Sequence, residues 1–336
     1  MSTSNRNLKI FKDKEVLITG GLGFIGSNLA HKLVELNARV TLVDCMLPGH
    51  GGNLYNIKNI ENEVKLNFCD VRDKHSMNFI VKDKDYIFHL AGQNDHVLAL
   101  NDPIPDLDIN VIGTAIVLEA CRHNNPDAVI IYSSTRGVYG PVSELPVKED
   151  TSPHPRGIYE MTNYTAEGLM GIYYHTHNIK SINLRLTNIF GPRAQMKHSR
   201  FGVVNWFIRL AMENEPISLF GGGEVIRDVL YVDDSIEAFL LAALNENAYG
   251  ETLNVASGSP TTIKDIAEKI IDIAGSGSLK VTKYSEERAK IEPGDFYADI
   301  SKIKKIAGWT PKTWIEDGIR STISFYNENK GYYWSE

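Results

Sequence analysis

Three glycines at intervals of three residues, Gly20, Gly23 and Gly26, constrain this chain of 336 residues more than any other feature. A short apolar run, Val16–Ile18, precedes them and a helical pattern follows them, which predicts a strand, a tight turn and the start of a helix. Glycine is needed where the backbone takes a positive φ or where a ligand approaches main-chain N–H groups closely. The free N–H groups and the positive end of the helix dipole at such a turn suit a pyrophosphate.

An acidic residue further along the chain makes this turn more specific. The run Arg39–Asp44 predicts a second strand that ends in Asp44, at the distance that the dinucleotide-binding fingerprint requires. A carboxylate there accepts hydrogen bonds from a ribose 2′-hydroxyl and repels a 2′-phosphate, and no Arg or Lys follows it closely. We therefore expect NAD rather than NADP. The alternative is that Asp44 is an ordinary acidic residue at a strand end with no contact to a cofactor.

Strand-like and helix-like patterns alternate through the first half of the chain. Apolar strand-like runs lie at residues 15–19, 39–44, 64–69, 85–90, 128–134 and 181–186, and helical patterns at 23–36, 110–122 and 159–177. Such alternation is typical of an α/β fold with a parallel sheet covered on both faces. We predict a doubly wound (Rossmann) sheet whose ligands bind at the carboxyl ends of the strands.

The pattern loosens after Gly191, where we expect helices near 202–212, 233–244, 262–274 and 314–327 and a strand near 252–255. These elements predict a smaller C-terminal substrate lobe interleaved with the Rossmann domain. The expected Rossmann domain comprises residues 1–190 plus about 226–256, and the lobe about 191–225 plus 257–336.

Composition excludes several classes of protein. The net charge of −7 and the absence of a basic tract argue against nucleic acid as a partner. No run approaches the roughly 18 apolar residues of a membrane span, and the polar first residues lack the apolar core of a signal peptide, so we expect a cytoplasmic protein. Cys45, Cys69 and Cys121 stand apart and indicate buried thiols rather than disulfides or zinc ligands, and we expect no metal site.

Three short pieces follow predicted strands and face the same sheet edge. In Cys69–Asp73 a side-chain acceptor could bind an adenine amino group, although a turn or helix-cap acid fits the spacing equally well. In His89–Gly92 small residues let the backbone come close to a ligand. The hydroxyls of Tyr132–Gly140 could bond a substrate oxygen, but they also suit a turn.

A fourth piece, Tyr159–Asn163, opens a predicted helix. Residues four apart share a helix face, so Tyr159 and Asn163 project together. A tyrosine near a cofactor can act as a general acid or base, but with a reference pKa of about 10 it needs a nearby cation to ionise near neutrality. Taken alone, this tyrosine fits a packed core residue better than a catalytic one.

Together and in this order, these pieces resemble the extended short-chain dehydrogenase/reductase family, which contains the sugar-nucleotide epimerases and dehydratases, similar to UDP-glucose 4-epimerase-like enzymes. The resemblance covers nearly the whole chain. The segments that carry it are Thr19–Gly26, Asp70–Val71, His89–Gly92, Asn110–Thr114, Ser133–Gly140, Leu184–Pro192, Arg227–Asp234 and Pro293–Ile300. It implies a Rossmann fold, bound NAD and a nucleotide-diphosphate sugar as substrate.

The resemblance also implies roles for individual residues. Tyr159 would be the general base, Thr135 its hydroxyl partner at the sugar, and Asn163 would stand in the position of a catalytic lysine. The cofactor-binding residues would be Gly20, Gly23, Phe24, Ile25, Gly26, Asp44, Asp70, Val71, Leu90, Ala91, Gly92, Asn110, Ser133, Tyr159 and Asn163. The substrate-binding residues would be Gln93, Thr135, Arg136, Asn188, Arg193, Arg227 and Asp295. Helices 110–122 and 159–177 would pair with their copies in a homodimer.

In that family the chemistry begins with hydride transfer from a sugar carbon, usually C4, to NAD. A 4-epimerase needs no further acid or base, whereas a 4,6-dehydratase must also remove the C5 proton and expel the C6 hydroxyl. Family dehydratases resembling this chain carry an Asp-Glu pair directly after the threonine, where this chain has Arg136 and Gly137. We therefore expect epimerisation, with 4,6-dehydration as the alternative and decarboxylation less favoured.

The sequence departs from the family pattern at two places. The family has Tyr-x-x-x-Lys, and here the fifth residue is Asn163, which can hydrogen-bond a ribose but cannot supply the charge that lowers the tyrosine pKa. A shift from 10 to 7 corresponds to about 4 kcal/mol. The positive charge that lowers the tyrosine pKa could come from Arg136, from Arg156 or from the nicotinamide ring. Alternatively, the chain binds NAD and the sugar nucleotide without catalysis, or it is a variant made to trap a complex. Glu292 replaces a phosphate-binding arginine, for which Arg288 or Lys290 could substitute.

Overall fold

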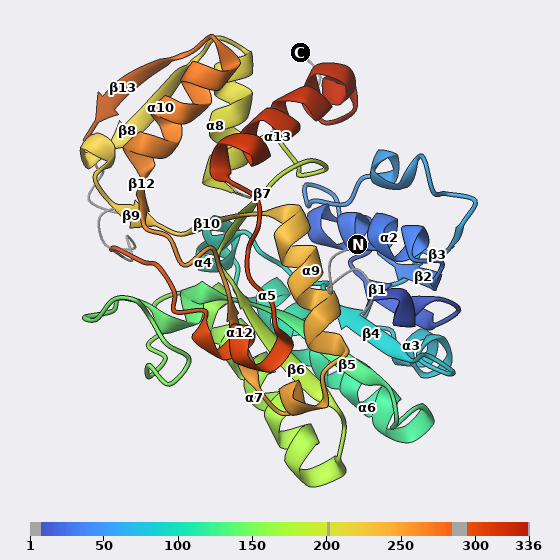
Figure 1. Ribbon diagram of the computed structural model, residues 1–336. Coiled ribbons are helices and arrows are strands. Elements are labelled where there is room, and N and C mark those ends of the chain that lie inside the picture. The colour runs from blue at the N-terminus through green and yellow to red at the C-terminus, as the bar shows by residue number, and fades with distance from the viewer. Residues whose placement is uncertain (1–7, 200–201, 284–293, 335–336) are drawn as a thin grey trace.

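Seven parallel strands form one sheet in the order β11-β6-β5-β4-β1-β2-β3 in the computed structural model, which describes residues 8–199, 202–283 and 294–334 (Figure 1). The strands are β1 (Glu15–Thr19), β2 (Arg39–Val43), β3 (Val64–Asn67), β4 (Tyr86–His89), β5 (Val129–Thr135), β6 (Ser181–Leu186) and β11 (Thr252–Val255). The direction of winding reverses between β1 and β4, and ligands of such sheets bind outside the carboxyl ends at that point. The predicted doubly wound α/β sheet is confirmed.

Helices cover both faces of this sheet because its strands are apolar on both sides. In β1, Val16 and Ile18 enter one core cluster and Leu17 enters the other, and all three are fully buried. The first cluster includes residues of α2 (Phe24–Glu35) and α9 (Val232–Ala243). The second includes residues of α3 (Lys74–Ile80), α6 (Thr114–Asn124) and α7 (Ile158–His177).

A smaller group of elements lies beyond the carboxyl ends of the strands, at the top of Figure 1. It comprises α8 (Val203–Met212), β8 (Pro216–Phe220), α10 (Ile263–Ala274), β13 (Ser278–Thr282) and α13 (Ile315–Asn329), and β8 pairs in parallel with β13. Its apolar side chains continue the first core cluster, so the two parts share one interior. The Thr262 side chain caps α10 at the Asp265 N–H (3.0 Å), and Gly275 ends the helix in the left-handed region.

The remaining elements are short. They are η1 (Lys9–Phe11), η2 (Leu54–Ile57), α4 (His96–Asn101), α5 (Ile104–Asp106), η3 (Leu107–Gly113), η4 (Arg136–Tyr139), β7 (Asn188–Phe190), η6 (Gly221–Gly223), β9 (Ile226–Arg227), β10 (Val229–Tyr231), η7 (Glu246–Ala248), β12 (Thr261–Thr262), α12 (Ser301–Ala307) and η8 (Lys330–Tyr332). The sequence predicted one helix over residues 110–122. In the structure the helical segment already begins at Leu107, because the π-helical η3 leads directly into α6. An apolar pattern of period 3.6 does not distinguish such a π-helical entry from a plain helix.

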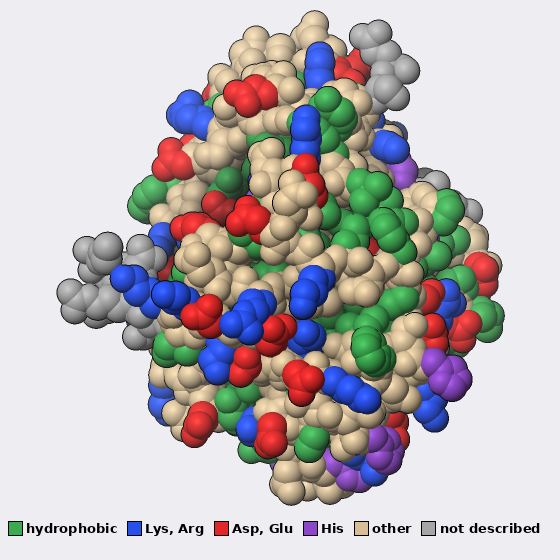
Figure 2. Space-filling model, turned by 90° about the vertical axis from the view of Figure 1, so that its right-hand side faces the viewer, with side chains coloured by type: hydrophobic (Ala, Val, Ile, Leu, Met, Phe, Trp, Pro, Cys, Tyr) green, Lys and Arg blue, Asp and Glu red, His purple; other side chains and the backbone are tan. Residues whose placement is uncertain are grey.

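The surface mixes charges of both signs, and Figure 2 shows Lys and Arg side chains interspersed with Asp and Glu on one face. Among the described residues, no helix is both long and apolar enough to cross a bilayer. All three cysteines are free thiols, but only Cys121 is buried. Cys45 is exposed and Cys69 is half-buried, so the prediction of three buried thiols is wrong for these two, because both follow strands at the open edge of the sheet.

Candidate active site

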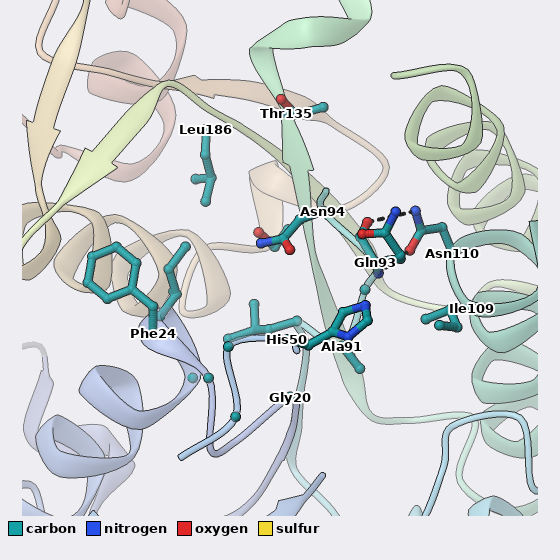
Figure 3. A pocket seen from close by; sticks show the side chains of 18 of the residues that line it. Gly20, Phe24, His50, Ala91, Gln93, Asn94, Ile109, Asn110, Thr135 and Leu186 are labelled. Carbon is teal, nitrogen blue, oxygen red and sulfur yellow. Dashed lines mark hydrogen bonds between the residues drawn. The ribbon is translucent and has the colours of Figure 1, made fainter. Parts of the chain in front are cut away.

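A cavity of about 360 Å³ opens at the carboxyl ends of β1, β4 and β5. Figure 3 shows its walls: the glycine turn with Gly20 and Phe24, the segment after β4 with Ala91 and Gln93, and the helix that carries Ile109 and Asn110. Every residue that the sequence analysis assigned to the cofactor lines this cavity. Of the predicted substrate residues, Gln93, Thr135 and Asn188 line it as well.

The glycine turn leaves room for hydrogen atoms only. Gly20 has a φ of +70°, and a Cβ there would lie 2.9 Å from the backbone of Leu90 and Ala91. A Cβ on Gly26 would lie 2.2 Å from the Gly20 carbonyl oxygen. The turn therefore packs backbone against backbone, and α2 begins directly after Gly23 with its N-terminal N–H groups at the cavity. This cradle fits the pyrophosphate of a dinucleotide.

Asp44 follows β2 and lies at the cavity wall. Its two carboxylate oxygens accept hydrogen bonds from the backbone N–H groups of Leu22 (3.0 Å) and Met46 (2.9 Å). Burial raises the pKa of Asp44, while these two hydrogen bonds act in the opposite direction. Each oxygen keeps a further lone pair, so the carboxylate can also accept the hydroxyls of an adenine ribose.

Asp70 lies at the cavity wall and also forms a turn. Its carboxylate lines the cavity and also accepts hydrogen bonds from the Arg72 backbone N–H (2.8 Å) and guanidinium (2.7 Å to Oδ2). The side-chain hydrogen bond from Arg72 holds the pKa of Asp70 below its ordinary value. The residue therefore forms a turn as well as a cavity wall, and contact with adenine stays a prediction.

Gln93 and Asn110 use most of their polar atoms within the protein. Asn110 Oδ1 accepts from the Gln93 backbone N–H (2.8 Å), and its amide nitrogen donates to the Gln93 carbonyl (3.1 Å), as Figure 3 shows. The Gln93 amide nitrogen donates to Asp106 Oδ2 at 2.6 Å. These bonds fix the wall of the cavity, which is a positioning role that sequence spacing could not distinguish from ligand contact.

Tyr159 and Thr135 meet at the mouth of β5. Thr135 ends that strand, and its hydroxyl accepts from the Gly137 N–H at 3.1 Å. Burial, and next the charge of Glu160, raise the pKa of Tyr159 well above its ordinary value; a hydrogen bond with Thr135 acts in the opposite direction. A phenol in this environment stays protonated at neutral pH unless further positive charge reaches it.

Asn163 does not supply that charge, and it is held by protein groups. Its Oδ1 accepts a hydrogen bond from the Tyr132 hydroxyl (2.9 Å), and its amide nitrogen donates to the Tyr159 carbonyl (2.8 Å). Tyr132 and Asn163 are both buried. Sequence reasoning missed this pairing because Tyr132 and Asn163 belong to different elements, β5 and α7, that only the fold brings together.

Four predicted substrate residues lie outside the cavity wall: Arg136, Arg193, Arg227 and Asp295. Arg227 donates to the Gly294 carbonyl (2.7 Å), and Asp295 accepts from the Ile226 N–H (2.8 Å), so the two brace one turn. Arg136 lies 5.0 Å above the Phe296 ring.

Arg193 borders a second cavity of about 310 Å³ and donates to Asn28 Oδ1 at 2.8 Å. Substrate contact for these four residues stays a prediction. Glu292, Arg288 and Lys290 fall outside the described residues.

Cavity residues that the sequence analysis did not name include His50, Asn94, His96 and Gln195. His96 contacts Tyr159 and Glu160. Among the described residues, no group of three or more His, Cys, Asp or Glu side chains could hold a metal ion.

Comparisons with known proteins agree with this geometry. A model of the NAD dependent epimerase/dehydratase family matches residues 16–256. A putative UDP-glucose 4-epimerase of Methanocaldococcus jannaschii is 31% identical over 94% of this chain and 99% of its own length. An epimerase structure from Methanothermobacter thermautotrophicus superposes with a TM-score of 0.91 at 25% identity, covering 98% of this chain and 96% of that one.

A structure of UDP-glucose 4-epimerase from Thermus thermophilus in complex with NAD superposes with a TM-score of 0.83 at 26% identity, covering 94% of this chain and 99% of that one. The glycine cradle and the placement of Asp44 fit the same cofactor. Since the family model spans more than half of the sequence and the fold agrees with it, the chain belongs to the NAD dependent epimerase/dehydratase family, whose cofactor is NAD.

Proposed function

We propose that this protein epimerises a nucleotide-diphosphate hexose at C4 through a transient 4-keto sugar. The observation that carries the proposal is the position of Tyr159, which lines the same cavity as Thr135, the glycine turn and Asp44. A dinucleotide held by that turn and by Asp44 would reach toward Tyr159. Relatives named as UDP-glucose 4-epimerases support the same reaction.

The roles of the residues follow from their contacts. Tyr159 accepts the proton of the sugar hydroxyl and returns it after the sugar has turned. Thr135, which hydrogen-bonds the phenol, holds that hydroxyl in line. The glycine turn and Asp44 would hold NAD, which would supply a reversible hydride acceptor for the sugar carbon. Asn188, which lines the cavity, would contact the substrate diphosphate.

Epimerisation is favoured over 4,6-dehydration by the two residues after Thr135. Arg136 lies against Phe296 and outside the cavity wall, and Gly137 has no side chain. Neither offers the carboxylate that removal of a C5 proton and loss of a C6 hydroxyl would use. Dehydration is the second candidate, and a silent NAD and sugar-nucleotide binder is the third, because Asn163 carries no charge.

A direct assay separates these candidates. The protein is incubated with NAD and a panel of UDP- and dTDP-hexoses, and the products are identified by NMR. We expect the C4 epimer from at least one substrate and none from the Tyr159→Phe variant. A 6-deoxy-4-keto product would identify the dehydratase instead, and substrate binding without turnover would identify the silent binder.

We also propose that the protein forms a homodimer through η3, α6 and α7. Large apolar side chains on these helices are exposed: Leu107, Ile112, Met161, Tyr164 and Ile172, the last by 55%. A second copy of the same helices would bury this stripe in a bundle of four. The division into a Rossmann domain and a substrate lobe at the predicted boundaries, and a cytoplasmic location, also remain proposals.

A further inference from the structure

A histidine and a glutamate flank Tyr159, and neither was expected from the sequence. His96 begins α4, on the segment that follows β4, and Glu160 follows Tyr159 in α7. His96 Nδ1 lies 2.8 Å from Glu160 Oε1. The rings of His96 and Tyr159 pack edge to face, with centroids 4.5 Å apart. The three side chains therefore form one contact group at the proposed sugar end of the cavity.

Two glycines make room for the Glu160 carboxylate. A Cβ on Gly137 would lie 2.8 Å from Glu160 Cγ, and a Cβ on Gly157 would lie 2.2 Å from Glu160 Oε2. The side chain of Glu160 is only 17% exposed. Its carboxylate thus fills the space beside the residue after Arg136, where the sequence itself offers no acid.

Glu160 orients the imidazole of His96. Burial alone would raise the pKa of Glu160, but the hydrogen bond to His96, a backbone hydrogen bond and nearby positive charge together lower it. An ionised carboxylate at Nδ1 fixes the proton on that nitrogen, which leaves Nε2 as a base for a ligand. The His96 side chain is 51% exposed and lines the cavity. Asp106 also interacts electrostatically with His96.

We propose that His96, held by Glu160, is a second acid–base residue that acts on the sugar carbon next to the keto group. The inference rests on the proposed function for the keto sugar as substrate class. Nε2 takes the proton from that carbon, the C–H electron pair forms a C=C bond, and the carbonyl electrons move to its oxygen. The Tyr159 hydroxyl donates a hydrogen bond to the resulting enolate, and reversal returns a proton from Nε2 to the carbon. No oxidant or reductant is consumed.

Exchange with deuterated water tests this step without requiring epimerisation. The holoprotein is incubated in D₂O with UDP-4-keto-6-deoxyglucose, and deuterium in the sugar is measured by mass spectrometry. We expect exchange well above the rate without protein, and a loss of about 10²-fold or more in His96→Gln, since general acid–base catalysis contributes that much. Glu160→Gln should reduce the rate less, because the imidazole remains.

The matched control is His75→Gln, which removes an exposed histidine outside the cavity wall. Thermal melting and NAD binding of each variant establish that the cavity is intact. Wild-type exchange no faster than background, or an unchanged rate in a folded His96→Gln variant, would overturn the inference. Exchange without epimerisation in the NMR assay would retain the inference and reject the proposed function, and epimerisation without exchange would do the reverse.

Discussion

Replacing Asn163 by lysine should add the missing cation beside Tyr159, but the structure predicts a cost that depends on Tyr132. Asn163 Oδ1 is the acceptor for the Tyr132 hydroxyl at 2.9 Å. Lysine has three donors and no acceptor, so Asn163→Lys leaves that buried hydroxyl without a partner. We expect the single variant to lose about 1–3 kcal/mol of unfolding free energy. Tyr132→Phe in the same chain removes the orphaned hydroxyl and should recover most of the loss.

The expected gain in activity follows from Coulomb's law. A charge about 5 Å from the phenol, at an effective dielectric constant of about 20, is worth about 3 kcal/mol. That energy lowers the Tyr159 pKa by about 2 units, which raises the phenolate fraction at neutral pH about 100-fold. Because burial raises the pKa of Tyr159, the phenol is mostly protonated at neutral pH, and the full increase in phenolate fraction applies there. The cation therefore acts where the phenol is otherwise protonated.

The assay compares Tyr132→Phe with the double variant Tyr132→Phe, Asn163→Lys. The pH dependence of kcat/KM should show an acid limb about 2 pH units lower in the double variant. Urea unfolding measures the stability cost of Asn163→Lys alone. If the limb does not move, the charge at position 163 does not control Tyr159. If Asn163→Lys alone is as stable as the wild type, the hydrogen bond between Tyr132 and Asn163 does not contribute to the free energy of unfolding.

Other sites give simpler predictions. Asp44→Ala should weaken NAD binding and reduce discrimination against NADP, measured by fluorescence titration with both cofactors. Unchanged affinities for NAD and NADP would show that Asp44 does not contact the ribose. Burial lowers the pKa of His89 to about 4, so the unfolded chain binds more protons between that pH and 6.5, and unfolding free energy should fall by about 2 kcal/mol from pH 7 to pH 5. His89→Gln should remove this part of the pH dependence of the unfolding free energy, which urea titrations at each pH measure. Ile172→Glu should convert the dimer to monomers, as measured by light scattering. Phe79→Glu, which changes an exposed side chain of α3, should leave the dimer intact. A dimeric Ile172→Glu variant would contradict the proposed interface.

Local patterns in the sequence were sufficient for the main sheet and the cofactor cradle. The apolar run before Gly20 and the glycine spacing predict a strand, a turn and a helix from residue types at short spacing. Strand β1 has the predicted bounds for that reason. The π-helical entry into α6 escaped prediction, because its hydrogen bonds span one residue more than those of an α-helix and a segment this short changes the apolar pattern little.

Contacts between distant segments were beyond local patterns. The sequence by itself determined the Rossmann sheet, the glycine turn and the position of Asp44 at the end of a strand, since each follows from residue type at short spacing. Only the tertiary structure decided that Tyr132 holds Asn163 and that Glu160 fills the space beside Gly137. These pairs join separate strands, turns and helices, so their geometry depends on how the elements pack. The electrostatic environment of Tyr159, on which the chemistry depends, is therefore a property of the fold and not of any one motif.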